Sequence, residues 1–237
     1  MSTFVLVHGA WHGGWCWHKI VPRLERLGHT VLAPDMAGHG LDRTPPEATT
    51  LKNLTESIAS VVEAQKEKVI LVGHSFGGAI IGEVGERCPE KILSLIYLAA
   101  FVVPNGKTTT EMSRDDSEIL LNRHLILAPD RKILSVNPKG LRESFYGQCS
   151  DEDEALGRAL IVPEGTAALL TPAVTSKERW GNLPHTYIEC LRDKAIGITR
   201  QRELAKHLVR PKVHSLDTDH SPFLSLPDAL TELLIRP

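Results

Sequence analysis

The sequence predicts an α/β fold built on a mostly parallel, doubly wound sheet that carries a helical insertion. Three observations lead to this prediction: short β-branched runs alternate with helical patterns, several of these runs are apolar almost throughout, and the alternation is interrupted once. Strands covered on both faces read as continuous apolar runs. Alternating strands and helices with short connections are typical of parallel sheets.

Six segments have the composition of such strands. They are residues 3–9, 29–35, 68–74, 92–100, 185–191 and 212–217. Helical patterns lie between them, over about 15–27, 50–66 and 76–87. A closing helix is expected over 225–235, where Pro227 and Asp228 suit the first turn.

Residues 102–180 interrupt this alternation. They contain charged helical patterns over 108–125 and 150–161 and scattered prolines, without a convincing strand. We therefore expect one core domain, formed by residues 1–101 and 181–237, that carries a helical cap rather than a second domain with its own sheet.

Composition narrows the function classes. The net charge is −2 and no Lys/Arg-rich block occurs, so nothing favours nucleic acid or an anionic membrane as a partner. We expect no signal peptide and no membrane span, because no apolar run is long enough. The four cysteines lie far apart without metal-ligand spacing, which indicates free thiols in a reducing cytoplasm and no metal site. They are Cys16, Cys88, Cys149 and Cys190.

Residues 73–77 read Gly-His-Ser-Phe-Gly, directly after the apolar run of 68–74 and before a helical pattern. A glycine-flanked serine can be a plain turn. In a strand–turn–helix context, however, G-x-S-x-G is the pattern of a nucleophile elbow, in which Ser75 sits on a sharp corner. Glycine at both flanking positions removes clashes with the strand and the helix. We therefore predict that Ser75 is a nucleophile.

A serine hydroxyl needs a base to take its proton. The chain order of this arrangement is nucleophile, acid, histidine, so the base is expected near the C-terminus. His220 follows the strand predicted over 212–217 and precedes the closing helix. His214 lies inside that strand and His185 begins the preceding one, so both are less suitable.

The acid is expected just after the strand that precedes the histidine strand. Asp193 holds this position, and it would fix the tautomer of His220. Asp217 and Asp219 are rivals because they are close to His220 in sequence, although they more readily shape its turn. The end of the strand over 92–100, another possible place for the acid, offers no carboxylate.

An oxyanion hole requires two N–H donors. One is expected from the backbone of Phe76, the residue after the nucleophile. The other is expected from Ala10, in the glycine-rich loop that follows the first strand. His8 and His12 lie in the same loop, where structural roles are favoured over catalytic ones.

The sequence resembles the plant methyl esterase and hydroxynitrile lyase branch of the α/β-hydrolases, which includes methyl salicylate esterases. The resemblance rests on "FVLVHGAWHGGWCWHKIVPRLERLGHTVLAPDMAGHG", "KVILVGHSFGG", "FYGQCSDEDEALGRALI", "ERWG" and "RDKAIG". It implies the α/β-hydrolase fold with a helical cap, no cofactor, and a possible homodimer. It also implies the triad of Ser75, Asp193 and His220 with donors Ala10 and Phe76.

Two positions separate the chemistries of this branch. The lyases resemble this chain except for a threonine at the place of Gly9 and a lysine at the place of Ser221. Without that lysine there is no cation to stabilise departing cyanide, and without the threonine no hydroxyl contacts the cyanohydrin. The resemblance therefore favours an esterase over a lyase.

The expected activity is hydrolysis of a small to medium ester through an acyl-enzyme. Related bacterial proteins include lactone and macrolide hydrolases, so a lactone substrate is a close alternative. A hydrolase fold that serves as a non-catalytic small-molecule receptor is a further one. Candidate substrate-binding residues, each of which can equally be ordinary packing, are His74, Phe145, Tyr146 and Trp180.

Overall fold

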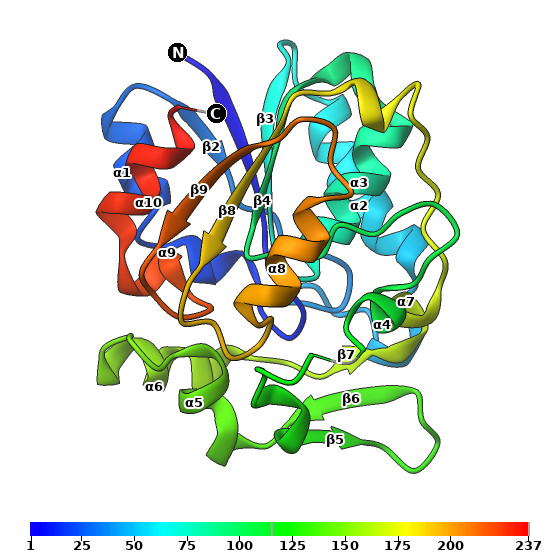
Figure 1. Cartoon of the computed structure of the whole chain (residues 1–237), viewed down its shortest axis with the longest axis vertical. Coiled ribbons are helices and arrows are strands. Elements are labelled where there is room, and N and C mark those ends of the chain that lie inside the picture. The colour runs from blue at the N-terminus through cyan, green and yellow to red at the C-terminus, as the bar shows by residue number, and fades with distance from the viewer. Residues whose placement is uncertain (115, 237) are drawn as a thin grey trace.

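A computed structural model, which describes residues 1–114 and 116–236, is organised around a parallel six-stranded sheet (Figure 1). All six predicted strands are present. They are β1 (Thr3–Val7), β2 (Thr30–Leu32), β3 (Val69–His74), β4 (Ile92–Leu98), β8 (His185–Cys190) and β9 (Lys212–Leu216). Every neighbouring pair runs parallel. Strand β3 is buried along its whole length, as its continuous apolar sequence predicts.

The strand order is β2-β1-β3-β4-β8-β9. The chain winds in one direction from β1 to β2 and in the other from β3 onward, so the order reverses between β1 and β3. In open α/β sheets, ligands bind outside the carboxyl ends of the strands at such a switch point. The loop after β1 and the corner after β3 therefore lie where a binding site is expected.

Helices cover both faces of the sheet. Figure 1 shows α1 and α10 on one side, packed against each other, and α2 and α3 on the other. The core helices are α1 (Val21–Arg26), α2 (Leu51–Glu63), α3 (Gly77–Arg87), α8 (Ile198–Ala205), α9 (Pro222–Ser225) and α10 (Pro227–Leu234). Across the described ranges, no helix is long and apolar enough to cross a membrane.

Three helices differ from the prediction. The short helix α9, just before the expected closing helix, was not predicted. The helix expected over about 15–27 is divided into a 3-10 turn (Gly14–Trp17) and α1, where Pro22 lies in the first turn and starts a new helix. Helix α8 was not predicted, because its few buried side chains give only a weak apolar stripe.

Residues 102–180 are called here the inserted segment. Most of it lies at the carboxyl ends of the strands, and its last residues run back along the side of the molecule to the start of β8 (Figure 1). The helices of the inserted segment are α4 (Thr109–Met112), α5 (Leu141–Phe145), α6 (Asp151–Leu160) and α7 (Thr166–Leu170). The helical pattern over 150–161 is confirmed as α6. In the pattern over 108–125, by contrast, only α4 and a 3-10 turn (Leu121–His124) are helical, and residue 115 lies outside the described residues.

The expectation that the inserted segment lacks strands is wrong. It holds a three-stranded antiparallel sheet formed by β5 (Leu125–Leu127), β6 (Ile133–Val136) and β7 (Glu164–Gly165). These strands are only two to four residues long. Such short runs cannot display the alternation by which a strand is recognised in sequence.

Candidate active site

Ser75 lies at the corner between β3 and α3 in a left-handed backbone conformation, with φ of 53°. A residue with a side chain adopts this conformation only where the surrounding structure imposes it. Its N–H donates to the carbonyl of Leu98 (3.2 Å), and its carbonyl accepts from the N–H of Phe101 (3.0 Å). Ser75 therefore occupies a strained corner at the carboxyl edge of the sheet.

The two glycines that flank this corner have steric roles. A Cβ at Gly73 would lie 2.6 Å from the carbonyl oxygen of Gly77, and a Cβ at Gly77 would lie 2.5 Å from that of His8. Both distances are shorter than real Cβ atoms tolerate. The tight packing of strand, corner and helix thus accounts for the G-x-S-x-G pattern.

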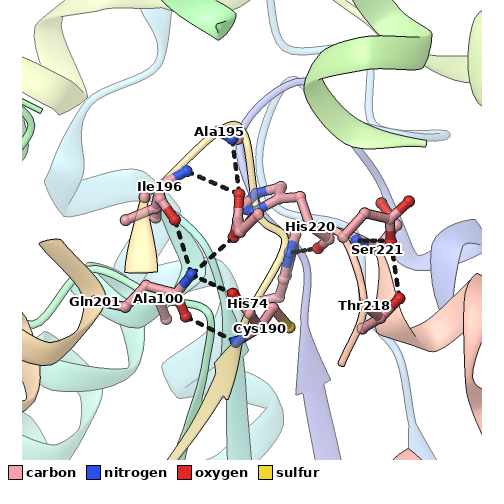
Figure 2. A network of polar contacts seen from close by, with 12 residues as sticks. His74, Ala100, Cys190, Ala195, Ile196, Gln201, Thr218, His220 and Ser221 are labelled. Atoms are coloured by element: carbon pink, nitrogen blue, oxygen red, sulfur yellow. Dashed lines mark hydrogen bonds and ion pairs between the residues drawn. The ribbon is translucent and has the colours of Figure 1, made fainter. Parts of the chain in front are cut away.

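His220 and Asp193 form a buried hydrogen-bonded pair (Figure 2). The Nδ1 atom of His220 lies 2.7 Å from Oδ2 of Asp193, and the two residues are 1% and 2% exposed. The other oxygen of Asp193 accepts from the N–H groups of Ala195 (2.7 Å) and Ile196 (2.9 Å). Because Nδ1 donates to the carboxylate, Nε2 of His220 is the nitrogen that can accept a proton.

Gln201 on α8 supports this pair and was not predicted. Its amide nitrogen donates to Oδ2 of Asp193 (3.2 Å) and to the carbonyl of Ile196 (2.7 Å), while its oxygen accepts from the N–H of Cys190 (3.0 Å). Gln201 is fully buried, and Figure 2 shows it below Ala195 and Ile196 on the loop after β8. A single glutamine in a polar helix gives no local signal of such a role.

His74 connects the serine corner to the histidine loop. Its Nε2–H donates to the carbonyl of His220 (2.8 Å), and the centroids of the His74 and His220 rings are 4.5 Å apart. Burial, together with the neighbouring His220, lowers the pKa of His74 well below its ordinary value, so the ring is a neutral donor. Within the described residues, no hydrogen bond joins the Ser75 hydroxyl directly to His220; the two residues are linked through His74.

The two rival carboxylates have different surroundings. Asp217 is 60% exposed and forms an ion pair with Arg192. Asp219 is buried and accepts from the N–H groups of Ser221 (3.1 Å) and Gln148 (2.7 Å). Asp219 therefore connects the loop that carries His220 to the inserted segment. Of the three candidate acids, Asp193 is the one that hydrogen-bonds to the imidazole ring of His220.

The amide groups of Ala10 and Phe76 are both available. In the part of the chain that the structure describes, neither N–H donates a hydrogen bond, and both residues line the same cavity as Ser75. The arrangement can thus offer two donors to an oxygen atom bound next to the serine.

His8 orients the amide of Ala10. Its Nε2 accepts from the N–H of Met36 (3.1 Å), so its Nδ1 carries the proton and donates to the carbonyl of Gly9 (2.8 Å). Burial and the neighbouring His39 lower the pKa of His8, which keeps this tautomer neutral. Because C=O and N–H point in opposite directions in a trans peptide, holding the Gly9 carbonyl on one side turns the Ala10 N–H to the other.

His12 fixes the next peptide of the loop. Its Nδ1–H donates to the carbonyl of Ala10 (2.8 Å), and its Nε2 accepts from the hydroxyl of Tyr146 (2.7 Å). Burial lowers the pKa of His12 to about 4, so it stays neutral at physiological pH. Both loop histidines therefore have structural partners, as the sequence favours.

A cavity of about 250 Å³ extends from Ser75 between the core and the inserted segment. Its lining is mostly apolar, and none of the described residues that form it is charged. They are Ala10, Trp11, Ser75, Phe76, Phe101, Thr109, Thr110, Ser113, Ile119, Leu121, Asn122, Leu125, Leu134, Leu169, Ala195 and Ile196. Three of them, Thr110, Ser113 and Asn122, also line an open groove of about 650 Å³, so the cavity meets solvent on that side.

The four predicted substrate-binding residues lie outside this lining. Three of them are fully buried beside the site: His74, Phe145 and Tyr146. The ring centroids of Phe145 and His220 are 5.7 Å apart. Trp180 instead donates its indole N–H to the hydroxyl of Tyr97 (2.8 Å), below the helix that follows Ser75. Nine of the sixteen lining residues come from several short segments of 102–180, which have no common sequence pattern.

No group of three or more His, Cys, Asp or Glu side chains in the described ranges is arranged to hold a metal ion. The four cysteines are unpaired and buried.

Comparison with known proteins agrees with this architecture. Residues 4–233 match the alpha/beta hydrolase family. The chain is 36% identical to "Salicylic acid-binding protein 2" of Nicotiana tabacum, over 98% of this chain and 95% of that protein. It is 32% identical to "Methylesterase 1" of Arabidopsis thaliana, over 98% and 94%. The crystal structure of a pyrethroid hydrolase from Sphingobium faniae JZ-2 superimposes with a TM-score of 0.90 at 29% identity, covering 99% of this chain and 96% of that one.

The chain therefore belongs to the alpha/beta hydrolase family. It is a hydrolase of the esterase type, as its relatives named methylesterase indicate.

Proposed function

We propose that this enzyme is a serine ester hydrolase that works through an acyl-enzyme formed on Ser75. The observation that carries the proposal is that Ser75 shares its cavity with two amide N–H groups, those of Ala10 and Phe76, that have no acceptor among the described residues. The buried pair of His220 and Asp193 supplies a base next to the same corner.

In the first half of the proposed reaction, Oγ of Ser75 attacks the ester carbonyl carbon and its proton passes to Nε2 of His220. The N–H groups of Ala10 and Phe76 stabilise the oxyanion. His220 then returns the proton to the departing alcohol. Water, deprotonated by His220, hydrolyses the acyl-enzyme and releases the acid, while Asp193 holds the ring and stabilises its charged form.

The Ser75 hydroxyl turns toward Nε2 of His220 in this mechanism when an ester fills the cavity. Hydrogen bonds of this kind are often long in empty sites and shorten in the complex with substrate. His74, which precedes Ser75 in the chain, donates to the carbonyl of His220 and so holds the two segments side by side.

The cavity supports an uncharged, largely apolar acyl or alcohol group as the substrate, because no described lining residue is charged. Its volume of about 250 Å³ favours a small ester over a macrolactone, whose bulk would have to occupy the open groove. A lactone or macrolide remains the second candidate, since ring opening uses the same groups. The names of the relatives, methylesterase and pyrethroid hydrolase, favour esters.

Two features argue against a hydroxynitrile lyase. A Cβ at Gly9 would lie 2.8 Å from Cβ of Ser75 and 3.1 Å from Nδ1 of His74, so the loop has no room for a threonine there. Ser221 is fully buried and carries no charge that could stabilise cyanide.

We also propose that residues 102–180 act as a cap over a core formed by 1–101 and 181–237, since nine of the sixteen cavity residues belong to that segment. A cytoplasmic location is proposed because all four cysteines are buried, unpaired thiols.

The test compares wild type, Ser75→Ala and Ser60→Ala, an exposed serine on α2 that serves as the control. Hydrolysis of p-nitrophenyl acetate and covalent labelling by a fluorophosphonate are expected in wild type and Ser60→Ala and are lost in Ser75→Ala. A Ser75→Ala variant that keeps its turnover contradicts the proposal, and a wild type that binds esters without turnover indicates a receptor.

A substrate screen then separates the remaining candidates. Aryl methyl esters, acyl-homoserine lactones and macrolides are incubated with the enzyme, and mass detection shows which gains one water. Cleavage of mandelonitrile in the same screen would support the lyase instead.

A further inference from the structure

Trp11, the residue after the proposed donor Ala10, has all of its polar groups bound by the inserted segment. Its N–H donates to Oε2 of Glu164 (3.4 Å), its carbonyl accepts from the N–H of Val162 (2.9 Å), and its indole N–H donates to the carbonyl of Leu134 (2.9 Å). Trp11 has a φ of 63°, which is a costly conformation for a bulky residue. The contacts from the inserted segment therefore hold the loop in a strained form.

Glu164 is itself held by a buried ion pair. Its Oε2 lies 2.9 Å from Nε2 of His39, and both side chains are fully buried. Burial lowers the pKa of His39, but the Glu164 carboxylate and the neighbouring Ala37 carbonyl and Asp35 outweigh it, so the pKa of His39 lies above its ordinary value. The buried carboxylate of Glu164 thus favours the protonated form of the ring that it contacts.

The hydrogen bonds of the loop restrain the peptides on both sides of Ala10. The peptide before it is held at the Gly9 carbonyl by His8. The peptide after it is held at the Ala10 carbonyl by His12 and at the Trp11 N–H by Glu164. Because both peptide planes are restrained, the direction of the Ala10 N–H is restrained as well.

We propose that Glu164, held in place by His39, is a positioning residue for the oxyanion hole: it holds the Trp11 peptide and thereby aims the N–H of Ala10 at the developing oxyanion. This inference rests on the proposed ester hydrolysis. It assigns the inserted segment a part in rate enhancement in addition to enclosing the substrate. An oxyanion donor acts mainly in the transition state, so misplacing it lowers kcat more than it raises KM.

The chain offers a matched control. His124 and Glu143 form a second histidine–glutamate pair in the same segment, but Glu143 is 48% exposed, and among the described residues it forms no hydrogen bond with the loop of Trp11. Glu143→Gln therefore makes the same chemical change away from the proposed oxyanion hole.

The experiment compares Glu164→Gln, Glu164→Ala and Glu143→Gln with wild type. For each, kcat and KM for p-nitrophenyl acetate are measured per active site, counted by fluorophosphonate labelling. Two inhibition constants are also measured: that of a phenylboronic acid, which forms a tetrahedral adduct on serine, and that of an unreactive anilide of similar shape.

Glu164→Gln keeps an acceptor but loses the charge-assisted bond, so kcat is expected to fall about 3- to 10-fold, with an equal loss of boronic acid affinity. Glu164→Ala removes the acceptor, and a fall of about 30-fold or more is expected. The KM, the anilide affinity and all constants of Glu143→Gln are expected to stay within about 2-fold of wild type.

Unchanged kcat and boronic acid affinity in Glu164→Gln would overturn the proposal. An equal loss of affinity for the boronic acid and for the anilide would overturn it as well, because it would show a general change in binding. If Glu164→Ala does not fold, Glu164→Gln decides alone, because it is nearly isosteric. A wild type that neither hydrolyses the ester nor binds the boronic acid would overturn the ester hydrolase assignment itself, which separates the two failures.

Discussion

His220 contacts Asp193, 27 residues away in the chain, rather than Asp217, which precedes it by three positions. The Nδ1–Oδ2 distance to Asp193 is 2.7 Å in a buried environment, while Asp217 pairs with Arg192 in solvent. The choice follows from the sheet: Asp193 lies on the loop after β8 and His220 on the loop after β9, and these two strands are parallel neighbours whose carboxyl ends meet.

Replacing Asp193 with Asn is expected to lower kcat by on the order of 10³–10⁴, because an amide can donate to Nδ1 and so favour the wrong tautomer of His220. The rate of p-nitrophenyl acetate hydrolysis per labelled active site measures the effect. Asp217→Asn is the matched control, and its kcat is expected to equal that of wild type. A near-normal rate in Asp193→Asn would contradict the assigned role.

Gly9→Ala is expected to lower kcat on the order of 10²-fold, since its Cβ would meet Cβ of Ser75 at 2.8 Å and displace the loop that carries the Ala10 N–H. Gly147→Ala serves as the control, because its nearest neighbour, the carbonyl oxygen of Arg142, is 3.8 Å away. Kinetics together with thermal unfolding test this prediction. Full activity in a folded Gly9→Ala would show that the loop tolerates the displacement.

Leu125→Trp is expected to narrow the cavity and raise KM for p-nitrophenyl octanoate by about 10-fold or more, with a smaller effect on the acetate. Leu125 lines the cavity, whereas Leu127 on the same strand is 42% exposed and does not. Leu127→Trp is therefore the control. Equal effects of the two substitutions on chain-length preference would rule out Leu125 as a wall of the substrate site.

The unfolding free energy is expected to decrease as the pH falls from 6.5 towards 4, with His185 as one contributor. Burial lowers the pKa of His185 from 6.5 to about 4, so the unfolded chain binds a proton there that the folded chain does not. The contribution of His185 to stability is present above pH 6.5 and is lost as the pH falls from 6.5 to about 4. The slope of unfolding free energy against pH from this group is at most about 1.4 kcal/mol per pH unit.

His185→Leu removes this contribution, and the slope of unfolding free energy against pH is expected to decrease. Both ring nitrogens of His185 are buried without a partner in the described residues, so the variant is expected to be no less stable at neutral pH. Denaturant unfolding across the window measures the slope, with His18→Leu at an exposed position as the control. An unchanged slope in His185→Leu would assign the acid sensitivity to other groups, such as His12.

The elements recognised from sequence are those governed by local rules. Apolar runs such as residues 68–74 predict buried parallel strands, and the glycines around Ser75 mark a corner with no room for Cβ atoms. The order of nucleophile, acid and histidine along the chain pointed to Asp193 and His220. Each of these inferences depends on a few neighbouring residues or on the known order of strands in a parallel sheet.

The contacts that complete the site were decided only by the tertiary structure. The sheet of the inserted segment, the cavity lining and the support of Asp193 by Gln201 have no local signature. Glu164 and His39 are 125 residues apart. Sequence patterns reflect steric constraints and the burial of apolar side chains over a few neighbouring residues. A buried polar contact instead depends on which distant segments the folded chain brings within hydrogen-bond distance.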